Sequence, residues 1–154
     1  MFIVLENVRS AYNVWNIIRT ADALGYDIII SGYTPSPFKD EKVRKTSLWA
    51  ENSVKILEFW NPKDTLTYLK SINSILIWAE ICHISIWLKD FVKNNNKIDH
   101  NIAIIFGNEV EWVLKETLET VDFVVFIPMI WEKESLNVWQ SAAIFMREFS
   151  QVNI

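Results

Sequence analysis

Glycine is scarce in this chain. It accounts for 3 of 154 residues, where a folded domain usually has about 7%. Tryptophan is abundant instead, with 8 residues, and the two types together reach about the share that glycine usually has alone. Because glycine serves in tight turns that other residues adopt poorly, the positions of these tryptophans matter more than their number.

Cysteine is nearly absent as well. Cys82 is the single cysteine, which excludes an internal disulfide and suits a reducing compartment such as the cytoplasm. Together with His83 it forms one Cys–His step that has no second pair of ligands. We therefore expect a buried thiol there and no metal site.

Long apolar runs are also missing. No stretch reaches the roughly 20 residues that span a bilayer, and the N-terminal "MFIVLENVRS" has no basic region before its short apolar stretch. We expect a first strand there, not a signal peptide, and no membrane partner. With 154 residues, 51% of them hydrophobic, the chain has the length and composition of one folded domain, residues 1–154.

A strong positive charge is lacking too. The net charge of −4 and the isoelectric point near 5.2 exclude a nucleic-acid coat protein that binds by bulk charge. They leave room for a local basic patch, and "FKDEKVRKTS" is a candidate with Lys39, Lys42, Arg44 and Lys45. The alternative is a solvated loop of mixed charges.

Short apolar runs rich in Ile, Val and Phe alternate with segments of helical periodicity. We expect strands at 2–7, 26–32, 54–59, 74–81, 101–107 and 122–128. Helices are expected at 13–25, 61–72, 111–121 and 135–150. This alternation predicts an α/β fold with a mostly parallel sheet and helices on both faces.

Three unusual segments come at or just beyond the carboxyl ends of expected strands. They read "ENVRSAYNVWNIIRT", "FGNEVEW" and "IPMIWEKESLNV". Ligands of such sheets gather at this edge, so we expect the functional site where these three segments meet.

These segments resemble the three signature motifs of the TrmH-like branch of the SPOUT RNA methyltransferases. The similarity extends over nearly the whole chain and includes "KTSLWAENSV". At four positions where the family has glycine, this chain has tryptophan, and Trp139 stands where a small residue is usual. The four positions are Trp15, Trp49, Trp112 and Trp131.

The resemblance implies a specific fold and activity. The fold would be the SPOUT α/β trefoil knot, in which the C-terminal helix threads through a loop. The reaction would transfer a methyl group from S-adenosylmethionine to a ribose 2′-hydroxyl of structured RNA, either tRNA or rRNA. A homodimer would carry the site, and no extra substrate-binding domain is expected.

The resemblance also implies which residues line the cofactor pocket. They are Gly107, Asn108, Ile127, Met129 and Leu136. An adenosine pocket can be built from main-chain groups of adjoining loops and apolar walls. Without the motif spacing, the same residues are ordinary strand-end hydrophobics and a turn glycine that need no ligand.

Five further residues match the family's catalytic positions: Asn13, Arg19, Glu109, Ser135 and Asn137. A guanidinium is effectively never deprotonated, so Arg19 suits gripping an RNA phosphate and stabilising a developing alkoxide better than acting as a base. Glu109 could accept a hydrogen bond from Asn13 or Arg19. The structural alternatives are a surface ion pair for Arg19, stabilisation of a helix N-terminus for Glu109, and helix caps for the other three.

The tryptophans at motif positions have three interpretations. They could stack on RNA bases, or they could fill the core, although replacing several glycines by indoles would overpack it. The third interpretation is a decoding artefact, since some bacterial lineages read the codon UGA as glycine while a common variant code reads it as tryptophan. We favour the third and expect the polypeptide as written to bind cofactor poorly or to misfold locally.

Two other functions are open. A catalytically inactive SPOUT-fold module for RNA binding or dimerisation would follow if Trp15, Trp112 and Trp131 were genuine. A nucleotide-binding doubly wound domain is less compatible with the sequence, which has neither a GxGxxG motif nor a Walker loop.

Overall fold

In the computed structural model of this chain, the described residues are 1–39, 53–95, 101–108, 113–132 and 134–151. Seven parallel strands from this part of the chain form one sheet in the order β3-β2-β1-β6-β4-β7-β5. Their bounds are β1 Phe2–Glu6, β2 Asp27–Ser31, β3 Ile56–Phe59, β4 Ile75–Ala79, β5 Ile86–Trp87, β6 Ile102–Phe106 and β7 Phe123–Phe126. All strands being parallel, their carboxyl ends lie on one edge, as the sequence predicts.

The three longest helices begin and end where the sequence indicates. Helix α1 (Ala11–Leu24) ends at Gly25, whose φ of 74° is the left-handed conformation that favours glycine. Helix α3 (Pro62–Ser71) has Asn61 as its N-cap and a proline in the first turn. Helix α6 (Val138–Ser150) has Asn137 as its N-cap. The helix cap considered as the structural alternative for Asn13 is not present, because Ser10 caps α1 and its side chain accepts from the backbone N–H of Asn13.

Two elements of the structure are not among those expected from the sequence, and a third is shorter than expected. Strand β5 has two residues, too few to show a periodicity. Helix α4 (Leu88–Asn94) buries Leu88, Phe91 and Val92, a helical spacing that was overlooked. The helix expected at 111–121 is confirmed only for α5 (Lys115–Leu118) among the described residues.

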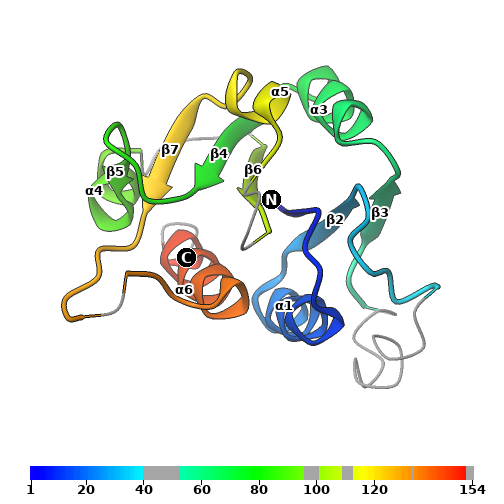
Figure 1. Ribbon diagram of the computed structural model, residues 1–154, viewed down its shortest axis with the longest axis horizontal. Helices are drawn as coiled ribbons and strands as arrows, with labels where there is room; N and C mark the ends of the chain where they lie inside the picture. The colour runs from blue at the N-terminus through cyan, green and yellow to red at the C-terminus, as the bar shows by residue number, and fades with distance from the viewer. Residues whose placement is uncertain (40–52, 96–100, 109–112, 133, 152–154) are drawn as a thin grey trace.

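The core lies on both faces of the sheet, as predicted. On one face α1, α4 and α6 pack against alternate strand residues such as Ile3, Leu5 and Ile104. On the other face α3 packs against residues such as Val4 and Ile105. Figure 1 shows α1 and α6 side by side along the first face and α3 and α5 along the second. These layers hold the carboxyl ends of the strands in place.

Cys82 and the apolar face of α6 differ in how deeply they are buried. Cys82 is only half-buried at the margin of the second cluster, so the expected buried thiol is wrong. The apolar face of "SAAIFMREF" packs into the core through Ala142, Phe145 and Met146. The phenolic O–H of Tyr26 also donates to the carbonyl of Met146 at 2.8 Å, which ties α6 to the start of β2.

Candidate functional site

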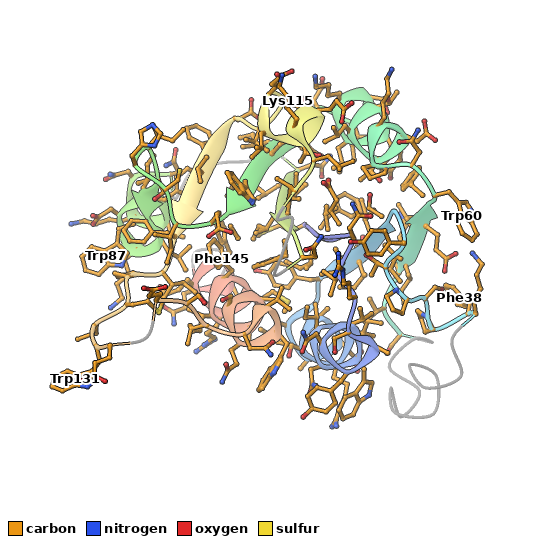
Figure 2. The ribbon with its side chains drawn as sticks, viewed as in Figure 1. Phe38, Trp60, Trp87, Lys115, Trp131 and Phe145 are labelled. Atoms are coloured by element: carbon orange, nitrogen blue, oxygen red, sulfur yellow. The ribbon has the colours of Figure 1, made fainter. Side chains whose placement is uncertain are left out.

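A pocket opens at the carboxyl ends of β4, β6 and β7 and is closed on one side by α6. Its volume is about 180 Å³. Its lining combines apolar side chains with polar groups of Glu80, Asn108 and Ser135, and Phe145 contributes to it from α6 (Figure 2). The lining residues are Ala79, Glu80, Ile81, Phe106, Gly107, Asn108, Phe126, Ile127, Met129, Ser135, Leu136, Val138, Ser141 and Phe145.

Six residues predicted from the sequence meet in this pocket. These residues lie at the ends of β6 and β7 and in the loop before α6. They are Gly107, Asn108, Ile127, Met129, Ser135 and Leu136. All five predicted cofactor residues are in this set, and Ser135 was predicted as catalytic.

The other predicted catalytic residues lie outside the pocket lining or outside the described part of the chain. The side-chain oxygen of Asn137 accepts from the backbone N–H of Trp139 at 3.1 Å, so its cap role is present. Asn13 is buried in the first turn of α1. Glu109 lies outside the described residues.

Arg19 is exposed on α1, and its guanidinium lies over the ring of Trp15 at 5.3 Å from the centroid. On the same helix, a carboxylate oxygen of Asp22 accepts from the Ser53 hydroxyl at 2.6 Å. A cation held over an aromatic face keeps its charge and stays solvated. Arg19 is therefore placed to meet an anion that approaches from solvent.

Beside the pocket, the ends of β1 and β2 are closed by a buried polar network. The carboxylate of Glu6 is 1% exposed and accepts from the backbone N–H of Leu114 and the hydroxyl of Thr117, each at 2.7 Å. Burial raises the pKa of Glu6, and these two hydrogen bonds oppose the rise. The hydroxyl of Thr34 donates to the carbonyl of Leu5 and accepts from the N–H of Val8.

Asn108 connects the pocket to this network. Its side-chain N–H donates to the hydroxyl of Tyr33 at 3.1 Å, and Nε of Arg9 donates to the same hydroxyl at 3.4 Å. The backbone N–H of Tyr33 donates to the side-chain oxygen of Asn7 at 3.2 Å. Residues from the ends of β1, β2 and β6 thus converge on Tyr33.

The expected basic patch is described only at Lys39, since 40–52 fall outside the described residues. The ammonium of Lys39 pairs with Glu58 at 2.6 Å and lies 4.2 Å from the ring centroid of Trp60. Phe38 and Trp60 are both exposed on this side of the molecule (Figure 2). Here a carboxylate neutralises the cation, so the described part of this patch carries little net charge.

None of the described tryptophans lines the pocket. Trp131 is 84% exposed, and its ring points away from the body of the protein (Figure 2). At position 131 the turn accommodates an indole by directing it into solvent (Figure 2). Among the described residues other than glycine, only Asn7 and Asn73 have positive φ angles. None of the described tryptophans therefore has the backbone conformation that favours glycine.

Two other tryptophans fit less well. The indole N–H groups of Trp15 and Trp78 are buried and have no hydrogen-bond partner. A buried indole N–H usually finds an acceptor, and leaving it unpaired costs about 1–3 kcal/mol. Trp49 and Trp112 lie outside the described residues.

Sequence reasoning missed Glu80, Ser141 and Tyr33. Glu80 and Ser141 line the pocket, and an acidic residue directly after a buried strand was the signal for Glu80. Tyr33 follows β2, and nothing in the sequence places it beside Asn108, 75 residues away. Among the described residues, no group of three His, Cys, Asp or Glu side chains could hold a metal ion, and no helix is long and apolar enough to cross a membrane.

Comparison with known proteins identifies the family of this chain. Residues 1–147 match the SpoU rRNA Methylase family. The chain is 28% identical over 148 residues to the 23S rRNA (guanosine-2′-O-)-methyltransferase RlmB of Blochmanniella floridana, covering 96% of this chain and 56% of that protein. It is 30% identical over 154 residues to an uncharacterised tRNA/rRNA methyltransferase of Borreliella burgdorferi, covering 99% and 64%. The chain thus spans less than two thirds of the length of both relatives.

The fold also matches solved structures. The AdoMet-bound rRNA methyltransferase from Sinorhizobium meliloti superimposes with a TM-score of 0.83 at 25% identity, covering 97% of this chain and 55% of that one. The predicted SPOUT-type α/β fold is confirmed by this similarity, and the threading of the knot stays a prediction. With the profile match, the similarity in sequence and the similarity in fold in agreement, the chain belongs to the SpoU rRNA methylase family.

Proposed function

We propose that this chain transfers a methyl group from S-adenosylmethionine to a ribose 2′-hydroxyl of tRNA or rRNA. The observation that carries the proposal is the pocket at the carboxyl ends of β4, β6 and β7, lined by the residues that the motifs predict. The AdoMet bound in the Sinorhizobium meliloti structure and the 2′-O specificity named for RlmB support it.

The residues of the pocket fit this methyl donor. Apolar walls at Ile127, Met129 and Leu136 suit an adenine ring, and the carboxylate of Glu80 complements a positively charged sulfonium. The enclosed volume of about 180 Å³ is below the roughly 300 Å³ of typical small-molecule sites. The ligand would therefore extend from the pocket toward solvent, where its methyl group is accessible to RNA.

S-adenosylmethionine supplies an activated methyl group, so the protein mainly has to align two reactants and exclude water. We assign Arg19 to an RNA phosphate and to the negative charge that develops on the ribose oxygen. Asn13 and Glu109 would orient that guanidinium. Ser135 and Asn137, at the start of α6, would contact cofactor and ribose, and the side chain of Asn137 also caps the helix.

We further propose that the active form is a homodimer. Ile130 and Trp131 are adjacent, large and apolar, and they are 95% and 84% exposed in the single chain. Burying them against a second copy would remove apolar surface from water. Sedimentation equilibrium would show a dimer, and Trp131→Asp would shift it toward monomer; a monomeric wild-type protein would contradict the proposal.

The activity is tested by transfer of tritium from labelled S-adenosylmethionine to total RNA from a strain that lacks this gene. Wild-type protein is expected to label RNA at ribose 2′-oxygens, and Arg19→Ala to lower the rate about 100- to 1000-fold. Lys115→Ala is the matched control, because Lys115 is exposed and pairs only with Glu119 on its own helix among the described residues.

Two results would contradict the proposal. RNA that stays unlabelled while it binds the protein would favour the inactive RNA-binding module. Label found on bases instead of riboses would keep the methyltransferase and remove its 2′-O specificity. If the label lies on riboses, mapping the 2′-O-methyl groups that are lost after gene deletion would identify the RNA and the nucleotide.

A further inference from the structure

Tyr33 occupies an unusual position beside the pocket. It follows β2, is 51% exposed, and yet its hydroxyl is held by two N–H donors from other elements. Asn108 donates to it from the end of β6 at 3.1 Å, and Arg9 donates from the segment after β1 at 3.4 Å. An exposed tyrosine that only filled space would need no such support.

The turn that carries Tyr33 is built to hold its backbone. Gly32 has a φ of 69°, and a Cβ atom there would collide with the side-chain oxygen of Asn7. That same oxygen accepts from the backbone N–H of Tyr33 at 3.2 Å. Gly32 allows both the positive φ and the close approach of Asn7. The turn therefore fixes the position of Tyr33.

The two N–H donors determine what the hydroxyl can still do. A phenolic oxygen accepts up to two hydrogen bonds and donates one. With Asn108 and Arg9 donating to it, the hydroxyl can offer its own proton to an acceptor in solvent. The neighbouring cation of Arg9 favours an acceptor with negative charge, and the exposed ring offers a flat apolar face.

Asn108 links these features to the donor pocket, because it lines that pocket and also supports Tyr33. A ligand that touched Tyr33 would lie at the rim of the pocket on its β1–β2 side. Phosphate oxygens, ribose oxygens and stackable bases occur together in an RNA strand.

We propose that Tyr33 binds the acceptor RNA next to the methylated nucleotide, with its hydroxyl donating to a phosphate or ribose oxygen and its ring stacking on a base. This inference rests on the proposed function, since it takes RNA as the substrate. Tyr33 is then a substrate-binding residue that Arg9 and Asn108 position.

The test compares Tyr33→Phe and Tyr33→Ala with wild type, using RNA from a strain that lacks this gene. Tyr33→Phe loses the proposed hydrogen bond to RNA and the acceptor shared by Asn108 and Arg9, and it is expected to raise the dissociation constant for RNA about 2- to 10-fold. Tyr33→Ala also loses the stacking face and is expected to raise it about 10- to 100-fold. The affinity for S-adenosylmethionine, measured by calorimetry, should stay within about twofold.

Tyr12→Phe is the matched control, because Tyr12 is 61% exposed and no hydrogen bond of its hydroxyl is seen among the described residues. It should leave RNA affinity unchanged, and thermal melting would confirm that all variants fold. The inference is overturned if Tyr33→Ala binds RNA as wild type does, or if it weakens S-adenosylmethionine as much as RNA. If wild type binds RNA without methylating it, the proposed activity fails, while the binding comparison still decides the role of Tyr33.

Discussion

The two halves of the carboxyl edge of the sheet satisfy their polar groups in opposite ways. At the ends of β1 and β2, buried polar side chains bond to one another and to the main chain, as Glu6 and Thr34 do. At the ends of β4, β6 and β7, the strands stop around an open pocket whose lining mixes apolar side chains with polar groups. The first half is closed by hydrogen bonds that hold the ends of β1 and β2 in place, whereas the second half has space for a ligand.

The contrast explains why binding and stability should depend on different residues. A buried polar group that is left without its hydrogen-bond partner costs its own full desolvation penalty. Substitutions in the closed half should therefore lower the free energy of unfolding. A side chain that faces an open pocket has fewer protein contacts, so changes there should act on the ligand. Asn108 lies at the boundary and takes part in both.

The largest expected effect is on the closed half. Glu6→Ala leaves the N–H of Leu114 and the hydroxyl of Thr117 without their acceptor, and we expect a loss of about 2–3 kcal/mol in the free energy of unfolding. Glu6→Gln keeps an acceptor and should lose less than about 1 kcal/mol. Urea denaturation measures both. Equal losses in the two variants would show that the carboxylate is not the acceptor these groups need.

On the open half, the expected effect is on binding. Leu136→Ala removes a half-buried wall of the pocket and should weaken S-adenosylmethionine about 10-fold, the equivalent of about 1.4 kcal/mol. Its free energy of unfolding should change by less than about 1 kcal/mol. Calorimetry and urea denaturation on the same sample separate the two quantities. A large loss of stability with unchanged affinity would reverse the comparison between the halves.

The pH dependence of stability gives a smaller effect with a definite sign. Burial raises the pKa of Glu6 above its ordinary value of 4.5, so the folded state binds this proton more tightly than the unfolded state does. The contribution of Glu6 to stability is therefore greatest below pH 4.5 and falls as the pH rises through the raised folded pKa. The unfolding free energy of wild type minus that of Glu6→Gln should therefore decrease as the pH rises. A difference that grows with pH would contradict this.

The smallest expected effect is at Trp131. Its ring is 84% exposed in the single chain and away from the pocket, so Trp131→Gly should change the free energy of unfolding of the monomer, measured below the concentration at which the chain dimerises, by no more than about 0.5 kcal/mol. Affinity for S-adenosylmethionine should stay within about twofold. If the glycine variant bound the donor 10-fold more tightly, the ring would have to enter the pocket in solution.

The decoding hypothesis is tested at the level of the gene. UGA codons at positions 15, 49, 112 and 131 would support glycine in the native protein, and UGG codons would end the idea. The unpaired indole N–H of Trp15 is the structural observation in its favour. The exposed ring of Trp131 removes the steric argument at that position.

Much of the framework is predictable because its signals are local. The strands are continuous apolar runs, and the ends of α1 and α3 carry a glycine and an Asn-Pro pair. The pocket residues Gly107 and Leu136 follow from motifs at strand ends. The role of Tyr33 and the burial of Glu6 could not be predicted, because each depends on contacts between residues 75 or more positions apart. The order of the strands in the sheet creates those contacts, and this order cannot be predicted from local sequence patterns.

Titration of the polypeptide as written with S-adenosylmethionine, by calorimetry, tests the central claim most directly. The motif positions predict poor binding, but none of the described tryptophans lines the pocket, so from the structure we instead predict saturable binding at one site per chain, abolished by Leu136→Asp in a variant that still folds. Binding that survives Leu136→Asp, or a folded wild-type protein that takes up no donor, would contradict the assignment of this pocket.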